Sequence, residues 1–179
     1  MFENKTYQKI RNLWELFLIY SFLGWVYEVF WCNMIEHNKG FINNGFLFGP
    51  WLPIYGIGMS IIVFVFMKLN IKTPGKTFLF GATICVIAEL IGSFIMEITT
   101  GSFLWNYEKY FLNFQGRIAL KPAIYFGGLI LLGTYFIRPK AIKLQKKYNE
   151  NITRNTLSIV IFSLFILDVL VRFKYGSNL

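Results

Sequence analysis

Five stretches of the 179-residue chain are almost continuously apolar, at about residues 13–35, 50–67, 77–98, 118–137 and 155–171. A helix needs about 20 mostly apolar residues to cross a bilayer. The pattern therefore predicts an all-α integral membrane protein with about five transmembrane helices. No internal repeat, low-complexity tract or linker interrupts it, so residues 1–179 are expected to form a single transmembrane domain.

The composition agrees with a membrane protein. Hydrophobic residues make up 55% of the chain and charged residues only 15%, and there are 20 Phe, 10 Tyr and 5 Trp. Soluble domains average about 25% charged residues. The net charge of +9 could indicate nucleic-acid binding. However, the basic residues lie between the apolar stretches, as in cytoplasmic loops of membrane proteins, so no nucleic-acid partner is expected.

The distribution of Lys and Arg predicts an orientation. Alternate loops hold twelve of the 18 basic residues on one side and six on the other. Basic loops stay in the cytoplasm, which places the N-terminus inside and the C-terminus outside. Arg11 and the lysine-rich segment 138–154 belong to the larger set. The segment is expected to act as the topology anchor, and an amphipathic helix on the anionic leaflet is the alternative. The first apolar stretch lacks a small-x-small cleavage site and should remain as a span.

Charged residues within spans are costly and commonly mark a functional site. Glu28, Glu89, Glu97 and Arg117 all fall at or outside the middle of the membrane in this orientation. They predict a polar pocket that opens outward. Glu28 and Glu89 have no basic residue one helical turn away, which favours a functional role for them.

A structural interpretation remains open for other charges. Glu97 could pair with Arg117, and Asp168 with Arg172 four residues later. The outer loops at 36–49 and 99–117 are rich in Trp, Tyr, Asn, Gly and Pro, a composition that suits the headgroup level of a bilayer. We expect these loops to fold back against the outer edge of the membrane.

Motifs for nucleotide, metal or covalent chemistry are absent from the sequence. Gly75-Lys76-Thr77 lacks the first glycine of a phosphate-binding loop, because Asn70 stands in its place. Cys32 and Cys85 lie inside apolar stretches, and the chain has one histidine. No cofactor or metal is therefore expected. A partner must supply any energy from ATP.

Three motifs resemble the bacterial membrane family of ABC-transporter permeases of the CmpB type. They are Tyr20-Ser-Phe-Leu-Gly-Trp-Val-Tyr-Glu28, Asn43-Asn-Gly-Phe-Leu-Phe-Gly-Pro-Trp-Leu-Pro-Ile-Tyr-Gly56 and Asn113-Phe-Gln-Gly-Arg-Ile-Ala-Leu120. The resemblance covers about residues 12–138. It implies a multi-pass protein of the bacterial plasma membrane.

The resemblance also implies candidate binding residues. Family motif positions are occupied by Glu28, Gly45, Gly49, Pro50, Pro53, Tyr55, Gly56, Glu89, Glu97, Trp105, Tyr107, Asn113, Gly116 and Arg117. The side chains expected to contact substrate are those of Glu28, Tyr55, Glu89, Glu97, Trp105, Tyr107, Asn113 and Arg117. The chain departs from the pattern at Asn44, Asn106 and Gln115. The first two changes remove opposite charges and put a salt bridge in doubt.

The predicted function is that of a transporter permease subunit with an outward-facing pocket for a small polar or ionic solute. Its expected partners are the lipid bilayer and an ATPase subunit or further copies of the chain. One alternative is a membrane enzyme acting on a lipid or lipid-linked precursor at the outer face, with Glu89 or Glu97 as base and Arg117 holding phosphate. Another is a non-catalytic accessory protein that binds a membrane partner through its aromatic loops.

Overall fold

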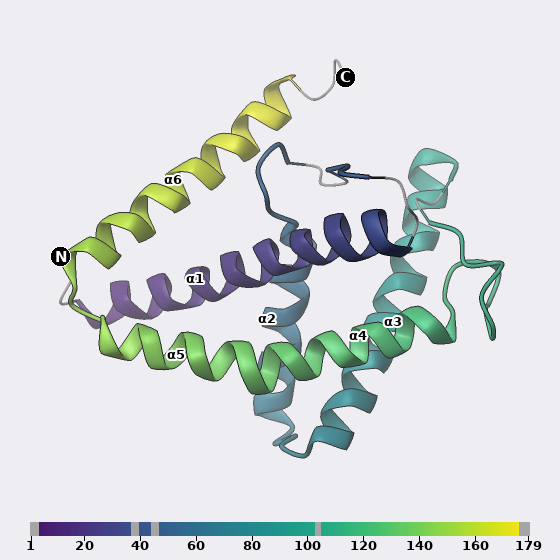
Figure 1. Cartoon of the computed structure of the whole chain (residues 1–179), viewed down its shortest axis with the longest axis horizontal. Coiled ribbons are helices and arrows are strands. Elements are labelled where there is room, and N and C mark those ends of the chain that lie inside the picture. The colour runs from purple at the N-terminus through teal and green to yellow at the C-terminus, as the bar shows by residue number, and fades with distance from the viewer. Residues whose placement is uncertain (1–3, 37–39, 44–46, 103–104, 176–179) are drawn as a thin grey trace. The chain divides into compact units, whose positions relative to one another are not determined.

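The computed structural model describes residues 4–36, 40–43, 47–102 and 105–175, apart from the side chains of 36, 99, 100 and 175. Within these ranges every regular element is helical, and the only strand-like pairing is an isolated bridge between Phe114 and Ile118. Figure 1 shows the helices in chain order. The elements are α1 (Lys5–Val26), η1 (Tyr27–Glu36), α2 (Pro53–Lys68), α3 (Pro74–Thr100), α4 (Leu120–Leu132), η2 (Gly133–Ile137), α5 (Arg138–Lys147) and α6 (Ile152–Tyr175).

Four helical stretches are long and apolar enough to cross a membrane: Lys5–Ile35, Pro74–Ile98, Leu120–Lys147 and Ile152–Lys174. They contain four of the five predicted spans, including the last one. The remaining apolar helix, α2, has only 16 residues. At 1.5 Å per residue it is about 24 Å long, shorter than the roughly 30 Å hydrocarbon core. The span predicted at about residues 50–67 therefore stays a prediction.

The contacts within the chain divide it into two compact units. Unit 1 comprises Met1–Ser60 and Arg138–Leu179, and unit 2 comprises Ile61–Ile137. Each unit is described by itself below. The single domain expected over 1–179 stays a prediction.

Local signals explain where the helices begin and end. The Asn4 side chain caps α1 by accepting hydrogen bonds from the backbone N–H groups of Thr6 at 2.8 Å and Tyr7 at 3.2 Å. Helix α3 begins with Pro74, whose missing N–H is no loss in a first turn. It ends where Gly101 adopts a left-handed φ of 80°. After Val26 the first helix continues as the π-helical η1, a form often found at functional sites.

Glycines allow close packing inside each unit. In unit 1 a Cβ on Gly56 would lie 2.5 Å from the Phe17 ring and 2.6 Å from the Phe17 backbone oxygen. In unit 2, where α3 packs on α4, a Cβ on Gly127 would lie 2.6 Å from the Phe78 ring. Small residues let membrane helices approach closely in this way.

We predict opposite effects for two alanine substitutions in α2. Gly56→Ala should destabilise the protein by about 1–3 kcal/mol, because the added methyl overlaps a backbone atom that cannot move aside. Gly58→Ala should be neutral or stabilise by up to about 1 kcal/mol, since no atom lies within 4 Å of its added Cβ and alanine favours a helix. Thermal melts in detergent measure both. Equal melting temperatures for the two variants would contradict the close contact at Gly56.

Candidate functional site

In unit 2 the segment after α3 forms a hydrogen-bonded loop. Tyr107 N–H donates to the Gly116 carbonyl at 2.8 Å, and Phe114 N–H donates to the Ile118 carbonyl at 2.9 Å. Gly116 has a φ of +67°, and a Cβ there would lie 2.6 Å from Asn106 Oδ1. Both the positive φ and the lack of space for a Cβ therefore favour glycine at this turn.

Asn113 shapes this loop from within. Its Nδ2 donates to the carbonyls of Glu108 and Tyr110, both at 3.0 Å, and its Oδ1 accepts from Gly116 N–H at 3.3 Å. All three partners are backbone groups of the loop. Asn113, expected to contact substrate, thus acts as a loop-forming residue in the structure, and its substrate contact stays a prediction.

Arg117, in the loop between α3 and α4, contacts a cluster of polar and aromatic side chains on α3. Its Nη2 lies 2.5 Å from Glu97 Oε2, and its Nη1 donates to Ser93 Oγ at 3.3 Å. The guanidinium carbon lies 4.1 Å from the centroid of the Phe94 ring, within cation–π range. Arg117 is only 6% exposed. The predicted Glu97–Arg117 pair is therefore confirmed.

Two aromatic residues attach the loop to this cluster. Trp105 Nε1 donates to the Arg117 carbonyl at 2.8 Å, which fixes the backbone that carries the guanidinium. Tyr107 OH donates to Glu89 Oε1 at 3.0 Å. Glu89, Ser93 and Glu97 are spaced by four residues on α3, so they lie along one side of that helix. Six of the eight predicted site residues belong to this part of unit 2.

The other two predicted residues meet in unit 1. Tyr55 OH, on α2, donates to Glu28 Oε1 on η1 at 2.5 Å. The Tyr27 ring contacts the Tyr55 ring edge-on, with centroids 6.3 Å apart. Glu28 has no basic residue one helical turn away in the sequence, and in the structure its partner is a phenol, which neutralises no charge. A single pocket wall that includes Glu28 with the unit 2 residues stays a prediction.

Asp168 on α6 binds the segment before α2. Its carboxylate accepts from the N–H groups of Phe48 at 3.0 Å and Gly49 at 2.7 Å, and from Trp51 Nε1 at 2.7 Å. Arg172 lies over the Phe48 ring, 5.2 Å from its centroid. The sequence suggested a local pair with Arg172, whereas these three donors lie more than a hundred residues away. Gly45, a family motif position, and Asn44, a departure from the pattern, lie outside the described residues.

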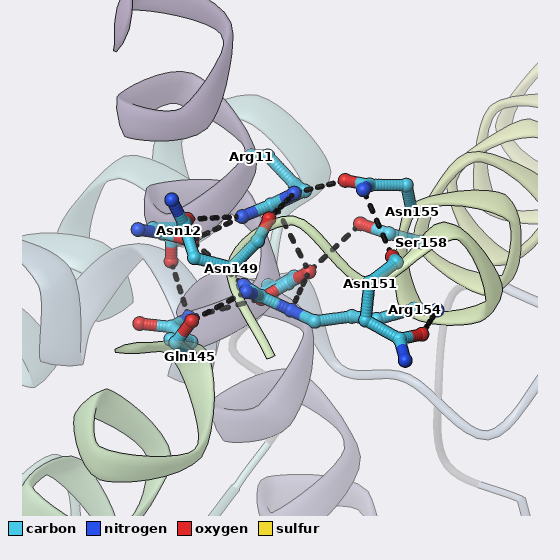
Figure 2. A network of polar contacts seen from close by, with 9 residues as sticks. Arg11, Asn12, Gln145, Asn149, Asn151, Arg154, Asn155 and Ser158 are labelled. Carbon is cyan, nitrogen blue, oxygen red and sulfur yellow. Dashed lines mark hydrogen bonds and ion pairs between the residues drawn. The ribbon is translucent and has the colours of Figure 1, made fainter. Parts of the chain in front are cut away.

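Unit 1 also contains a largely buried polar network that the sequence did not indicate (Figure 2). Glu15 lies 2.5 Å from Arg154 Nη2 and 3.7 Å from Arg11 Nε. Arg11 is 1% exposed and bonds to Asn149 and Asn155, partners that its count among the basic residues of one side did not indicate. The network comprises Arg11, Asn12, Glu15, Gln145, Asn149, Asn151, Arg154, Asn155 and Ser158.

The network ties together α1, the α5–α6 turn and α6. Arg11 donates to the Asn149 carbonyl at 3.0 Å and also bonds the fully buried Asn155. Ser158 Oγ donates to Glu15 at 2.9 Å. One sequence signal could have indicated part of it, since Arg11 and Glu15 are four residues apart on one helix.

Comparisons with known proteins place these features in a family. No curated protein and no solved structure matches the chain. The sequence profile of a family described as "Putative ABC-transporter type IV" matches residues 15–173. The match extends beyond residue 138, where the motif resemblance ended, and includes most of α6. With these residues matched and its apolar helices long enough to span a membrane, the chain is a multi-pass, transporter-related membrane protein that belongs to this ABC-transporter-type family.

Proposed function

We propose that the protein is a permease subunit of an ABC-type transporter in the bacterial plasma membrane, and that the Arg117 cluster is part of its solute site. The observation that carries the proposal is a buried guanidinium set against a candidate membrane span. Ionised groups at membrane depth are costly and are commonly retained for substrates or ions. The solute class that suits two carboxyl groups, a guanidinium and a phenol is a small polar or ionic molecule.

The geometry supports exchange of a partner at Arg117. The arginine side chain is 7% exposed, whereas the Glu97 side chain is 45% exposed. The guanidinium is thus held in place by Ser93, Phe94 and its own backbone, while the carboxylate opposite it is accessible. A solute with an acceptor group could replace part of the Glu97 interaction without moving Arg117. Tyr107 and Glu89 offer further polar contacts from the same loop and helix.

The proposed orientation places this loop outside and the N-terminus in the cytoplasm. Loop residues Trp105, Tyr107 and Arg117 would then receive solute from the outer face. Because the sequence lacks a phosphate-binding loop, the subunit would need an ATPase partner at the cytoplasmic face. The same cluster could instead hold the phosphate of a lipid precursor, and the experiment below distinguishes the two functions.

Native mass spectrometry of the protein, extracted gently from its own membrane, tests the proposal. A permease subunit should travel with a protein that carries nucleotide-binding motifs, in a fixed ratio to this chain. A tagged membrane protein of similar size, extracted in parallel, controls for chance association. A homo-oligomer with no ATPase would contradict the proposal. Turnover of a lipid in vesicles, and not bound lipid alone, would then establish the lipid-acting enzyme.

A further inference from the structure

A hollow of about 410 Å³ lies beside the buried network of unit 1. It is lined by Lys5, Gln8, Lys9, Asn12, Lys146 and Asn149. Small-molecule sites have volumes of about 300–1,000 Å³. The four lining residues on α1 are spaced i, i+3, i+4 and i+7, so they share one face of that helix. The hollow therefore lies between this face of α1 and the end of α5.

The charge of the lining is entirely positive. Three of the six residues are lysines and none is acidic. Lys5 and Lys9 are one helical turn apart on α1, so they repel each other unless an anion lies between them. The first turn of α1 contains no acidic residue to offset the positive end of the helix dipole. An anion is the ligand that this arrangement favours.

The network behind the hollow adds to this positive charge (Figure 2). Arg11 and Arg154 share the carboxylate of Glu15, so the network carries one positive charge in excess. Arg11 is buried, and its Nη2 lies 2.8 Å from Asn149 Oδ1. Asn149 also lines the hollow, so the excess charge lies one side chain away from any ligand there.

The two asparagines that line the hollow are held by the arginines of the network. Asn12 Oδ1 accepts from Arg154 at 2.7 Å, and Asn149 Oδ1 accepts from Arg11 at 2.8 Å. An amide whose oxygen accepts from an arginine retains its N–H groups as donors, and these donors suit an anion. Gln145 donates to the Asn12 carbonyl at 3.0 Å, which fixes α1 to α5 and sets the width between the walls.

We propose that this hollow binds a phosphate group, with an anionic phospholipid as its source. Ammonium and amide N–H groups are the usual partners of phosphate oxygens. The hollow lies at the ends of the candidate spans Lys5–Ile35 and Leu120–Lys147, where phospholipid headgroups are found. Leu13, one turn beyond Lys9 on the same side of α1, is 68% exposed and offers an apolar surface to an acyl chain. This site is independent of the solute site in unit 2.

Lipid binding to the full-length protein in detergent tests the proposal, with native mass spectrometry as the readout. The probes are phosphatidylglycerol, phosphatidylcholine and inorganic phosphate. The triple variant Lys5→Gln/Lys9→Gln/Lys146→Gln removes the lysines of the hollow. Its matched control is Lys76→Gln/Lys140→Gln/Lys143→Gln, which removes the same charge at three exposed lysines elsewhere. All six substitutions are at exposed positions, and melting temperatures verify that both variants fold.

The wild-type protein and the control should prefer phosphatidylglycerol to phosphatidylcholine by at least about tenfold, and the hollow variant by less than about twofold. Equal preferences in the two triple variants, or no preference in the wild type, would overturn the site. Millimolar inorganic phosphate distinguishes the two sources of the group. No displacement of phosphatidylglycerol supports the lipid as the ligand. Displacement that requires the same three lysines supports a phosphate site but overturns lipid as its source.

Discussion

Glu15→Ala is expected to lower the melting temperature of the protein by about 6–20 °C. Glu15 accepts hydrogen bonds from Arg154, Gln145 and Ser158 in the buried network. Removing one partner of a buried ion pair costs about 3–5 kcal/mol, because the other charge is left without compensation. Here two arginines lose their shared carboxylate. Each kcal/mol corresponds to about 2–4 °C for a protein of this size.

The chain supplies the reporter for this measurement. Cys32 and Cys85 are half-buried thiols, so a thiol-reactive dye should label them as the protein unfolds. Glu150→Ala is the matched control, since it removes an exposed carboxylate from the α5–α6 turn. A difference of about 2 °C corresponds to about 1 kcal/mol, the smallest effect that this melt resolves. If Glu15→Ala and Glu150→Ala melt within about 2 °C of each other, the network does not stabilise unit 1.

A double substitution separates lost charge balance from lost packing. Glu15→Met/Arg154→Met removes both members of the closest pair and keeps apolar volume in their place. Replacing a buried ion pair by apolar residues is often neutral or stabilising. The double variant should therefore be more stable than Glu15→Ala. If the double variant were less stable than Glu15→Ala, the cost would arise from altered packing or from the loss of the other hydrogen bonds that Arg154 makes.

What the sequence predicted correctly depends on local information. Apolar length identified four candidate spans, because the cost of exposing backbone to lipid makes long helices the natural solution. The Glu97–Arg117 pair was also anticipated, since both residues flank the same loop. The span predicted at residues 50–67, which lies over α2, carries no charge before Lys68, so composition favoured it. The 16 residues of α2 became evident only when the structure began the helix at Pro53.

What the sequence missed depends on partners far along the chain. Arg11 and Arg154 were counted as loop charges, because the positive-inside rule uses position and ignores tertiary partners. Several of their hydrogen bonds join residues 138 to 144 positions apart. Asp168 is a similar case, because the i+4 spacing to Arg172 offered a local partner. The structure gives its carboxylate three donors around Phe48 and Trp51.

Function should be lost in two variants of the unit 2 cluster, Glu89→Gln and Arg117→Ala. Glu89→Gln keeps the shape of the side chain and an oxygen that can accept from Tyr107, but removes the charge. Arg117→Ala removes the guanidinium and leaves Glu97, whose side chain is partly exposed and can be solvated. Loss of a hydrogen bond to a charged group costs about 1.5–3 kcal/mol. Transport activity should therefore fall by at least about tenfold.

Complementation of a deletion strain measures this effect before the solute is identified. Each variant is expressed in the strain, and its relative fitness is scored over many nutrient conditions. Glu108→Gln and Lys109→Ala are matched controls, since both are exposed charges in the same loop. The amount of folded protein in the membrane is measured for every variant, so that loss of function is separated from loss of protein.

The pattern across the four variants decides the role of the cluster. Loss of function in Glu89→Gln and Arg117→Ala, with wild-type amounts of folded protein and active controls, supports a solute or catalytic role. Reduced protein in Arg117→Ala alone would indicate that the guanidinium mainly holds the loop on α3. Glu89→Gln then becomes the stricter test, because it leaves the loop contact intact. Full complementation by both variants would show that the cluster is structural and that solute binds elsewhere.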